Sequence, residues 1–374
     1  PKFWVNEDGS LGERNDIVCS GVEEKMGLHG SATCSMTLGS KGVCRGLLLG
    51  EANKGMRIMF TMMNEARLGV GLQAMVTGSA AYLYALDYAR QRVQGRDLSE
   101  AMNHAAPSVE IINHPDVRRM LLEMKAYVEG MRSLTYFVAR NMDGADNETD
   151  PEKKNYYEGL VGLLTPVLKT YNSNKGYDVC IKAIQVYGGA GYTCDYPVEQ
   201  LARDCKIASI YEGTDGIQAM DLLARKIGAN NGQVFMGFLE EIKTVTDRAK
   251  AVEALKPLAE QVEKLSGRLG DCAMYMGKTA MSENFRTAFA HSVPFLEVMG
   301  DTAMAWMLLW RASIAAEKLA GGAKKKDMDY YEGQIKSAEF FINNLVPVTF
   351  GKIDAVEAGG DAAVTISDAA FGGK

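Results

Sequence analysis

Residues 113–142 read NHPDVRRMLLEMKAYVEGMRSLTYFVARNM and carry the clearest helix signal in the chain. Pro115 suits the first turn of a helix, where its missing N–H is not needed. Mostly apolar residues then recur at alternating spacings of four and three, which places them on one helical face. The spacing predicts a long helix with one buried stripe, formed by Val117, Leu121, Met124, Val128, Met131, Thr135 and Val138.

The neighbouring segments extend the helical pattern over most of the chain. Residues 1–50 are the exception, because they contain β-rich runs, including ATCSMTLGS and GVCRGLLLG, separated by turn sequences. About fifty residues of β pattern are too few for a free-standing sandwich or barrel. We therefore expect a mainly α protein in three parts: the end of a β-domain (1–50), a helical bundle (51–227) and an additional helical domain (228–374).

Two polar segments are expected to interrupt the bundle. DGADNETDPEKKN (143–155) reads as a loop, and NSNKG (172–176) reads as a break between two helices. Later helices are expected at about 234–270, 281–320 and 328–346, with Pro257 and Pro294 as kinks or breaks.

The composition argues against several classes of function. The chain has 374 residues, a net charge of −6 and no apolar run of membrane-spanning length, so we expect neither nucleic-acid binding nor a membrane span. Its seven cysteines and four histidines show no metal-ligand spacing. An odd number of cysteines in a large chain suggests reduced thiols. We expect a cytoplasmic protein without a metal site.

The stretch QVYGGAGY (185–192) places three glycines within four positions. Glycines let a backbone approach a flat or anionic ligand closely. The stretch is not a Rossmann fingerprint, because neither the third glycine nor the βαβ unit is present. A helix C-cap followed by a turn also explains the glycines, so both interpretations stay open.

Two charged clusters interrupt apolar helices. YARQRVQGRD (88–97) contains three arginines, which either complement the negative end of a helix or clamp an anion such as phosphate. In MMNEARLGVG (62–71), the polar residues Asn64, Glu65 and Arg67 need partners. They form either a structural ion pair or part of a ligand wall.

A carboxylate stands beside a glycine in Tyr211-Glu212-Gly213-Thr214. Thr214 and Asp215 suit the start of the following helix, which Asp215 and Gln218 open with capping-box spacing. Glu212 is therefore either a plain loop residue or a general base with space cleared by Gly213. Near a surface of low polarity a carboxylate has a raised pKa, which suits it to accept a weakly acidic proton.

The order and spacing of these segments resemble the C-terminal signature of the acyl-CoA dehydrogenase family. The resemblance is carried by Gln185-x-x-Gly188-Gly189, by YPVEQLARDCKIASIYEGT and by the helix ending LLARKI. Arg67 and Arg92 also fall where the family has a substrate-side and a flavin-side arginine. Residues 228–374 exceed the ordinary family length and are similar to a longer subfamily that includes 3-methylmercaptopropionyl-CoA dehydrogenase.

The resemblance implies FAD-dependent α,β-dehydrogenation of an acyl-CoA to a trans-2-enoyl-CoA, with Glu212 as the catalytic base and flavin N5 as the hydride acceptor. It implies an acyl-CoA site lined by Asn64, Arg67 and the backbone of Gly213. The FAD contacts that it implies are Arg92 and Gln94 on the pyrophosphate side, Thr214 near the flavin, and Gln185, Gly188 and Gly189 from a neighbouring subunit.

Three alternatives stand beside this interpretation. Some family members carry the base immediately before the arginine at position 67; here that position is Ala66, and Glu65 is one residue away, so we favour Glu212. An acyl-CoA oxidase shares the fold and the base but passes electrons to oxygen. A helical scaffold without a cofactor would keep the fold alone.

The resemblance also implies partners. An electron-transferring flavoprotein is the expected electron acceptor, and a homodimer or homotetramer is the expected assembly. The sequence starts at Pro1 and shows no counterpart of the family's N-terminal helical domain. We therefore expect this chain to be a truncated form of a longer protein.

Overall fold

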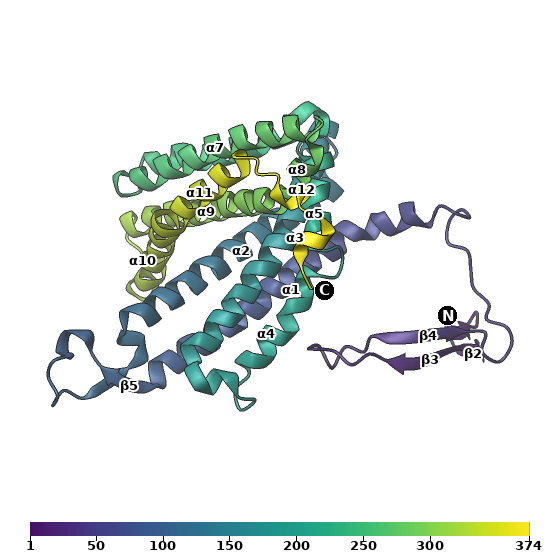
Figure 1. Ribbon diagram of the computed structural model, residues 1–374, viewed down its shortest axis with the longest axis horizontal. Helices are drawn as coiled ribbons and strands as arrows, with labels where there is room; N and C mark the ends of the chain where they lie inside the picture. The colour runs from purple at the N-terminus through teal and green to yellow at the C-terminus, as the bar shows by residue number, and fades with distance from the viewer. Residues whose placement is uncertain (374) are drawn as a thin grey trace. The chain divides into compact units, whose positions relative to one another are not determined.

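The computed structural model describes residues 1–373, apart from the side chains of residues 57, 60 and 61. The chain divides into two compact units, Pro1–Asn64 and Glu65–Lys374. The first unit holds short strands and the second is built almost entirely of helices (Figure 1). The expected mainly helical fold class is confirmed, and the bundle and the additional C-terminal helices belong to one compact unit.

The first unit contains two antiparallel strand pairs. β1 (Phe3–Val5) pairs with β2 (Leu11–Arg14), and β3 (Ile17–Val22) pairs with β4 (Cys34–Leu38). The expected strand at residues 42–50 is wrong, because this segment pairs with no strand in the described part of the chain. Leu47, Leu48 and Leu49 are exposed there, so neither strand pairing nor a buried face holds the run extended.

Helix α1 (Gly55–Gln91) leads from the first unit into the second. It is followed by β5 (Val93–Arg96) and β6 (Ser108–Glu110), which form an antiparallel hairpin that the sequence did not predict. Short 3₁₀ turns lie at Leu98–Glu100 and Ile111–Asn113.

The two longest helices after α1 are α2 (Pro115–Asn147) and α3 (Pro151–Tyr187). The stripe predicted on α2 is confirmed, because six of its residues are buried and Val117 packs against the core. The loop expected at 143–155 is wrong, since only residues 148–150 separate the helices.

The helix break expected at 172–176 is also wrong, because α3 continues through it. The polar side chains of this segment find partners inside the folded unit. Asn172 donates to the hydroxyl of Thr135 at 3.1 Å, and the Ser173 hydroxyl donates to the carbonyl of Lys169 at 2.5 Å. Satisfied polar groups do not interrupt a buried helix.

The C-terminal half consists of helices. Pro257 lies in the first turn of α7 (Lys256–Ala280), and Pro294 lies in the first turn of α9 (Ser292–Ala320). Proline is tolerated in a first turn, so neither residue kinks its helix. Two π-helical turns, Leu222–Lys226 and Phe341–Leu345, continue α5 and α10, and 3₁₀ turns lie at Gly188–Tyr192, Ile207–Ser209, Ala229–Gly232, Glu253–Leu255 and Asp368–Phe371. The helix bounds are α4 (Val198–Lys206), α5 (Asp215–Asp221), α6 (Gln233–Lys250), α7 (Lys256–Ala280), α8 (Phe285–Ala290), α9 (Ser292–Ala320), α10 (Lys325–Phe340), α11 (Val346–Glu357) and α12 (Ala362–Thr365).

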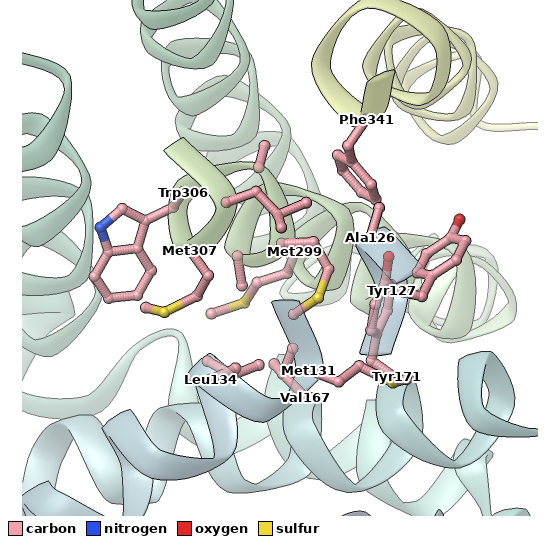
Figure 2. Close-up of a cluster of buried hydrophobic side chains, with 14 of the residues drawn as sticks. Ala126, Tyr127, Met131, Leu134, Val167, Tyr171, Met299, Trp306, Met307 and Phe341 are labelled. Carbon is pink, nitrogen blue, oxygen red and sulfur yellow. The ribbon is translucent and has the colours of Figure 1, made fainter. Parts of the chain in front are cut away.

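Helix α9 forms the centre of the core (Figure 2). Trp306 on this helix is fully buried, and its ring meets the edges of Phe137 from α2 and Phe238 from α6 at centroid distances of 4.9 and 5.7 Å. The most apolar stretch of the sequence, residues 303–316, is therefore a core helix. Among the described helices none is long and apolar enough to cross a membrane.

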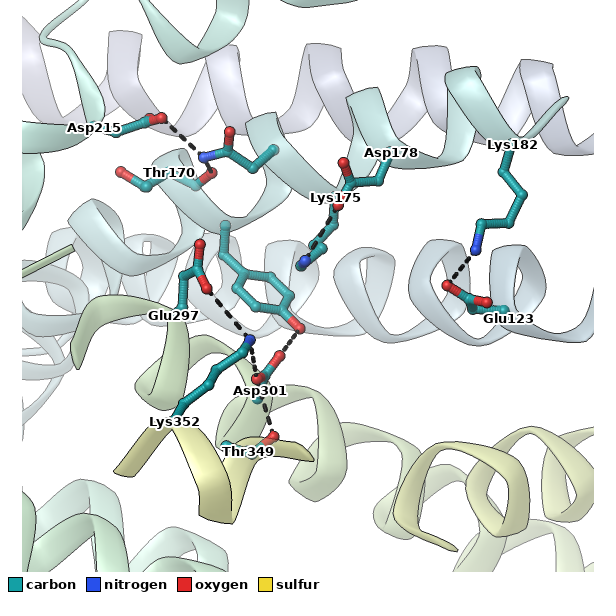
Figure 3. A network of polar contacts seen from close by, with 12 residues as sticks. Glu123, Thr170, Lys175, Asp178, Lys182, Asp215, Glu297, Asp301, Thr349 and Lys352 are labelled. Carbon is teal, nitrogen blue, oxygen red and sulfur yellow. Dashed lines mark hydrogen bonds and ion pairs between the residues drawn. The ribbon is translucent and has the colours of Figure 1, made fainter. Parts of the chain in front are cut away.

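Tyr171 on α3 joins the bundle to the C-terminal helices. Its hydroxyl donates to Asp301 on α9 at 2.6 Å, and its ring lies against Gly300. Asp301 also accepts hydrogen bonds from Thr349 at 3.0 Å and from Lys352 at 2.9 Å, both on α11 (Figure 3). One buried carboxylate thus connects three helices, and each of its contacts satisfies a polar group removed from water.

We expect Gly300→Ala to destabilise the protein, because a methyl group there would lie 2.0 Å from the Tyr171 ring. Overpacking of this kind costs about 1–3 kcal/mol of unfolding free energy, which urea denaturation measures. Gly267→Ala on α7 is the matched control, since an added Cβ meets nothing within 4 Å there. Because position 267 is exposed, alanine there should raise the unfolding free energy by up to about 1 kcal/mol through its higher helix propensity. Equal effects of the two substitutions would contradict the close packing at Tyr171.

Candidate functional site

A pocket of about 700 Å³ lies in the second unit, where the end of α1 and the β5–β6 hairpin meet the end of α3. Five of the six residues expected to contact FAD line it, although they come from segments about ninety positions apart in the sequence. They are Arg92, Gln94, Gln185, Gly188 and Gly189. All five are exposed, so they are available to a ligand.

The backbone requires glycine at two of the three glycine positions in the 188–191 turn, for different physical reasons. Gly188 has a φ of +64° and ends α3, a conformation that other residues adopt only with strain. A Cβ at Gly191 would lie 2.7 Å from the Cβ of Tyr187. Gly189 has neither constraint, since a Cβ there meets nothing within 4 Å and its φ is not left-handed. The fold therefore does not require glycine at 189, and the residue faces the pocket.

His114 lines the same pocket and was not anticipated from the sequence. A nitrogen of its ring, Nε2, lies 2.7 Å from the carbonyl oxygen of Gln94. Gly95 has a φ of +72°, and a Cβ there would come within 3.4 Å of the same nitrogen. The imidazole thus holds the hairpin that carries Gln94. No local motif marks His114, because the hairpin brings it to Gln94 from twenty positions away.

Three tyrosines form the apolar side of the pocket. Tyr88 and Tyr187 stack with ring centroids 4.0 Å apart, and Tyr196 meets Tyr187 edge-on at 5.2 Å. Burial raises the pKa of Tyr187, so this phenol stays neutral near pH 7. The pocket therefore combines aromatic faces with a guanidinium and two amides, a combination suited to a ligand with both planar rings and anionic groups.

The Tyr211–Thr214 segment forms a tight loop in a second part of the unit. Glu212 and Gly213 both have left-handed backbone conformations, with φ of +54° and +92°. The side-chain amide of Gln218 donates to the carbonyl of Glu212 at 3.2 Å. The expected capping role of Gln218 is therefore wrong: its Nε2 binds loop carbonyls, and Thr214 begins α5 without a side-chain cap. Thr214 is exposed, and its hydroxyl is not used to cap the helix.

Lys169 on α3 lies beneath this loop and was also missed from the sequence. It is fully buried, and its Nζ donates to the carbonyl of Gly213 at 2.6 Å. Burial lowers the pKa of Lys169, and the nearby carboxylates of Asp215 and Glu212 oppose that effect. Only the tertiary fold places this lysine beside the loop, 44 positions away.

Arg67 is buried on α1 and forms an ion pair with Asp221 of α5, at 3.3 Å. Asp221 also accepts from Arg225 at 2.7 Å, so its charge is shared. The Nε of Arg67 has no hydrogen-bond partner among the described residues. Asn64 is exposed and belongs to the other compact unit, so its assignment to the substrate stays a prediction.

The described residues contain no group of three or more His, Cys, Asp and Glu side chains that could hold a metal ion. All seven cysteines are free thiols. Eight of the predicted site residues thus gather at two places in the second unit: five line the pocket beside the β5–β6 hairpin, and Glu212, Gly213 and Thr214 form the loop.

Comparisons with known proteins match two segments of the chain to family models. Residues 53–227 match the family model for the acyl-CoA dehydrogenase C-terminal domain, and residues 238–367 match the model described as acetyl-CoA dehydrogenase C-terminal like. The chain is 35% identical to butyryl-CoA dehydrogenase of Syntrophomonas wolfei, over 99% of this chain and 61% of that protein. It is 33% identical to 3-methylmercaptopropionyl-CoA dehydrogenase of Ruegeria pomeroyi, over 98% of this chain and 61% of that protein.

A solved structure shares the fold. The acyl-CoA dehydrogenase of Bacillus anthracis, complexed with FAD, superposes with a TM-score of 0.69 at 20% identity, over 95% of this chain and 57% of that chain. The two family models together match residues 53–227 and 238–367, so the chain belongs to the acyl-CoA dehydrogenase family. Within it, the chain is similar to members with an additional C-terminal domain, such as the Ruegeria enzyme. The chain spans about three fifths of the length of the curated relatives it matches.

Replacing Gly213 by alanine tests the loop geometry. Its left-handed φ strains any L-residue, and a Cβ would lie 2.5 Å from the Gln218 amide. We expect a loss of about 1–3 kcal/mol in unfolding free energy, measured by urea denaturation. Gly216→Ala is the control three residues away, where an added Cβ meets nothing within 4 Å. A Gly213→Ala protein as stable as the Gly216→Ala protein would contradict the strained loop.

Proposed function

We propose that the whole protein is an FAD-dependent acyl-CoA dehydrogenase, which converts an acyl-CoA to a trans-2-enoyl-CoA with Glu212 as the base. The observation that carries the proposal is the pocket in which Arg92, Gln94, Gln185 and Gly189 come together. The family relationship supports the reaction class. Because the chain covers about 61% of the length of these relatives, the proposal concerns the protein to which it belongs.

The residues of the pocket fit a flavin dinucleotide. Arg92 offers a guanidinium to the pyrophosphate, and the amides of Gln94 and Gln185 supply donors and acceptors. The open face at Gly189 lets a ligand approach the backbone. Since residues from β5 and from the end of α3 line one pocket, we propose that both groups contact the same FAD molecule, in place of the expectation that only Gln185, Gly188 and Gly189 reach it from a neighbouring subunit. Thr214 stays the proposed contact near the flavin. FAD, when bound, supplies the acceptor for the hydride that leaves the substrate Cβ.

Glu212 is assigned to remove the Cα proton, which the thioester carbonyl makes acidic. Its side chain is half-buried on the loop, and no side chain among the described residues donates a hydrogen bond to its carboxylate. A carboxylate without a strong partner remains free to accept a proton. We further propose that the backbone of Gly213, the unpaired Nε of Arg67 and the side chain of Asn64 orient the acyl-CoA.

We propose an electron-transferring flavoprotein as the electron acceptor and a homodimer or homotetramer as the assembly, both from the family relationship. We also retain the three-part division at residues 50/51 and 227/228 as a proposal, supported by the two family models that match 53–227 and 238–367.

The test of the base uses the whole protein with FAD, under anaerobic conditions and with a panel of acyl-CoAs. We expect one class of acyl-CoA to bleach the flavin absorbance, and Glu212→Gln to slow bleaching by at least about 100-fold, the usual scale of a general base. Glu65→Gln is the matched control, because Glu65 is the exposed acidic alternative on α1. Bleaching that survives Glu212→Gln but not Glu65→Gln would move the base to α1, and rapid reoxidation by oxygen would indicate an oxidase.

The FAD pocket is tested by Gly189→Ala. The fold tolerates a methyl group there, but the methyl would occupy the space into which the dinucleotide is proposed to fit. We expect unchanged urea stability and an FAD dissociation constant raised about tenfold, or about 1.4 kcal/mol. The control is Gly277→Ala on α7, also free of contacts within 4 Å. If the whole protein binds FAD equally well with both substitutions, the pocket is not the cofactor site.

A further inference from the structure

Lys169 is a fully buried lysine whose ammonium group points at one backbone carbonyl. Its Nζ lies 2.6 Å from the oxygen of Gly213, the residue that follows Glu212. Among the described residues, no carboxylate is close enough to form an ion pair with it. Removing an ammonium group from water is costly unless its hydrogen bonds are good. A simple structural role would not require a charge here, since an apolar side chain fills a core at lower cost.

The charged groups around Lys169 are the groups of the proposed active site. Burial lowers the pKa of Lys169; Asp215 of α5 raises it, Arg67 of α1 lowers it, and Glu212 raises it. Asp215 is itself half-buried, and burial raises its pKa. Glu212 is therefore close enough to Lys169 to interact with its charge.

Two donors hold the strained loop from different helices. Lys169 of α3 binds the carbonyl of Gly213, and Gln218 of α5 binds the carbonyl of Glu212. Backbone conformations with positive φ at two successive residues persist only where the surroundings fix them. Gln218 belongs to the helix that follows the loop, whereas Lys169 reaches the loop from α3, so Lys169 ties the loop to the bundle.

We propose that Lys169 is a positioning residue for the base: it holds the Gly213 carbonyl and so fixes the loop that carries Glu212. The inference rests on the proposed function, because it concerns the base assigned there. Lys169 contacts the backbone of the loop and acts on Glu212 through that contact.

The experiment uses the whole protein with FAD and compares Lys169→Met, Lys169→Arg and Lys206→Met. Methionine fills a similar volume without a charge, and arginine keeps the charge. Lys206 is the matched control, because it also acts electrostatically on Asp215 but donates to the Ser209 hydroxyl and not to the loop carbonyl. The first readout is the rate of anaerobic flavin bleaching at a saturating concentration of an acyl-CoA that reduces the wild-type protein, with the half-saturating concentration measured alongside. The second is hydrogen exchange of the backbone amides of residues 211–216.

Without the Lys169 donor the Gly213 carbonyl is no longer held, so Glu212 is placed less accurately for proton removal. We expect Lys169→Met to slow bleaching at saturating acyl-CoA by at least about tenfold, with little change in the half-saturating concentration, and to speed exchange in the loop at least about tenfold. Lys169→Arg, which keeps a donor, should recover part of both effects, and Lys206→Met should change neither readout.

An unchanged bleaching rate in Lys169→Met overturns the proposal, as does a rate that falls equally in Lys206→Met. If Lys169→Met does not fold, Lys169→Arg decides: fast loop exchange with an unchanged bleaching rate in this variant overturns the proposal. If the proposed function is wrong, the result is different, because none of the acyl-CoAs would then bleach the flavin of the wild-type protein. Hydrogen exchange of the backbone amides of residues 211–216 can still be measured in that case. Equal exchange rates in wild type and Lys169→Met would overturn the proposal that Lys169 fixes the loop.

Discussion

The second unit depends on the turn of α3 at residues 169–174, in which four polar side chains each bind a different neighbour. Lys169 binds the Gly213 carbonyl, Tyr171 binds Asp301, Asn172 binds Thr135, and Asn174 binds Asp215 at 2.9 Å. A buried polar group without a partner costs about 1–3 kcal/mol, so this turn is stable only when the loop, α9, α2 and α5 are all in place. Dispersed partners of this kind specify one arrangement of helices more strongly than apolar packing does.

This arrangement connects the C-terminal helices to the candidate site. Tyr171 and Lys169 are two residues apart on α3; one is held by α9 and the other holds the loop of Glu212. Asp301 is fixed in turn by Thr349 and Lys352 of α11 (Figure 3). Burial lowers the pKa of Lys352, but Asp301 and Glu297 outweigh that effect and raise it overall, so the lysine remains a cation. The additional helices therefore support α3, the helix whose Lys169 holds the loop.

The sequence predicted the features that depend on local pattern. The stripe on α2 follows from spacing alone, and the family resemblance placed Arg92, Gln185 and Gly189 in one functional class before the fold brought them into one pocket. The break expected at 172–176 was wrong for a physical reason. Local rules penalise Asn172 and Ser173 inside a helix, whereas Thr135, 37 positions away from Asn172, supplies the partner that removes the penalty. His114 and Lys169 were missed likewise, because each acts on a backbone carbonyl distant in sequence.

The glycine beside Glu212 has a structural explanation that also bears on function. Gly213 has a φ of +92° and no room for a Cβ, because the Gln218 amide occupies that space while it binds the preceding carbonyl. Glu212 takes a left-handed conformation as well, at a cost of about 1 kcal/mol or more for a residue with a side chain. A plain surface loop has no reason to retain two such residues. Here Lys169 and Gln218 use the two carbonyl oxygens, so the backbone of the loop is fixed from the protein side. The carboxylate of Glu212 is the one acidic group of the loop left without a hydrogen-bond donor among the described residues, which is the condition that a base requires.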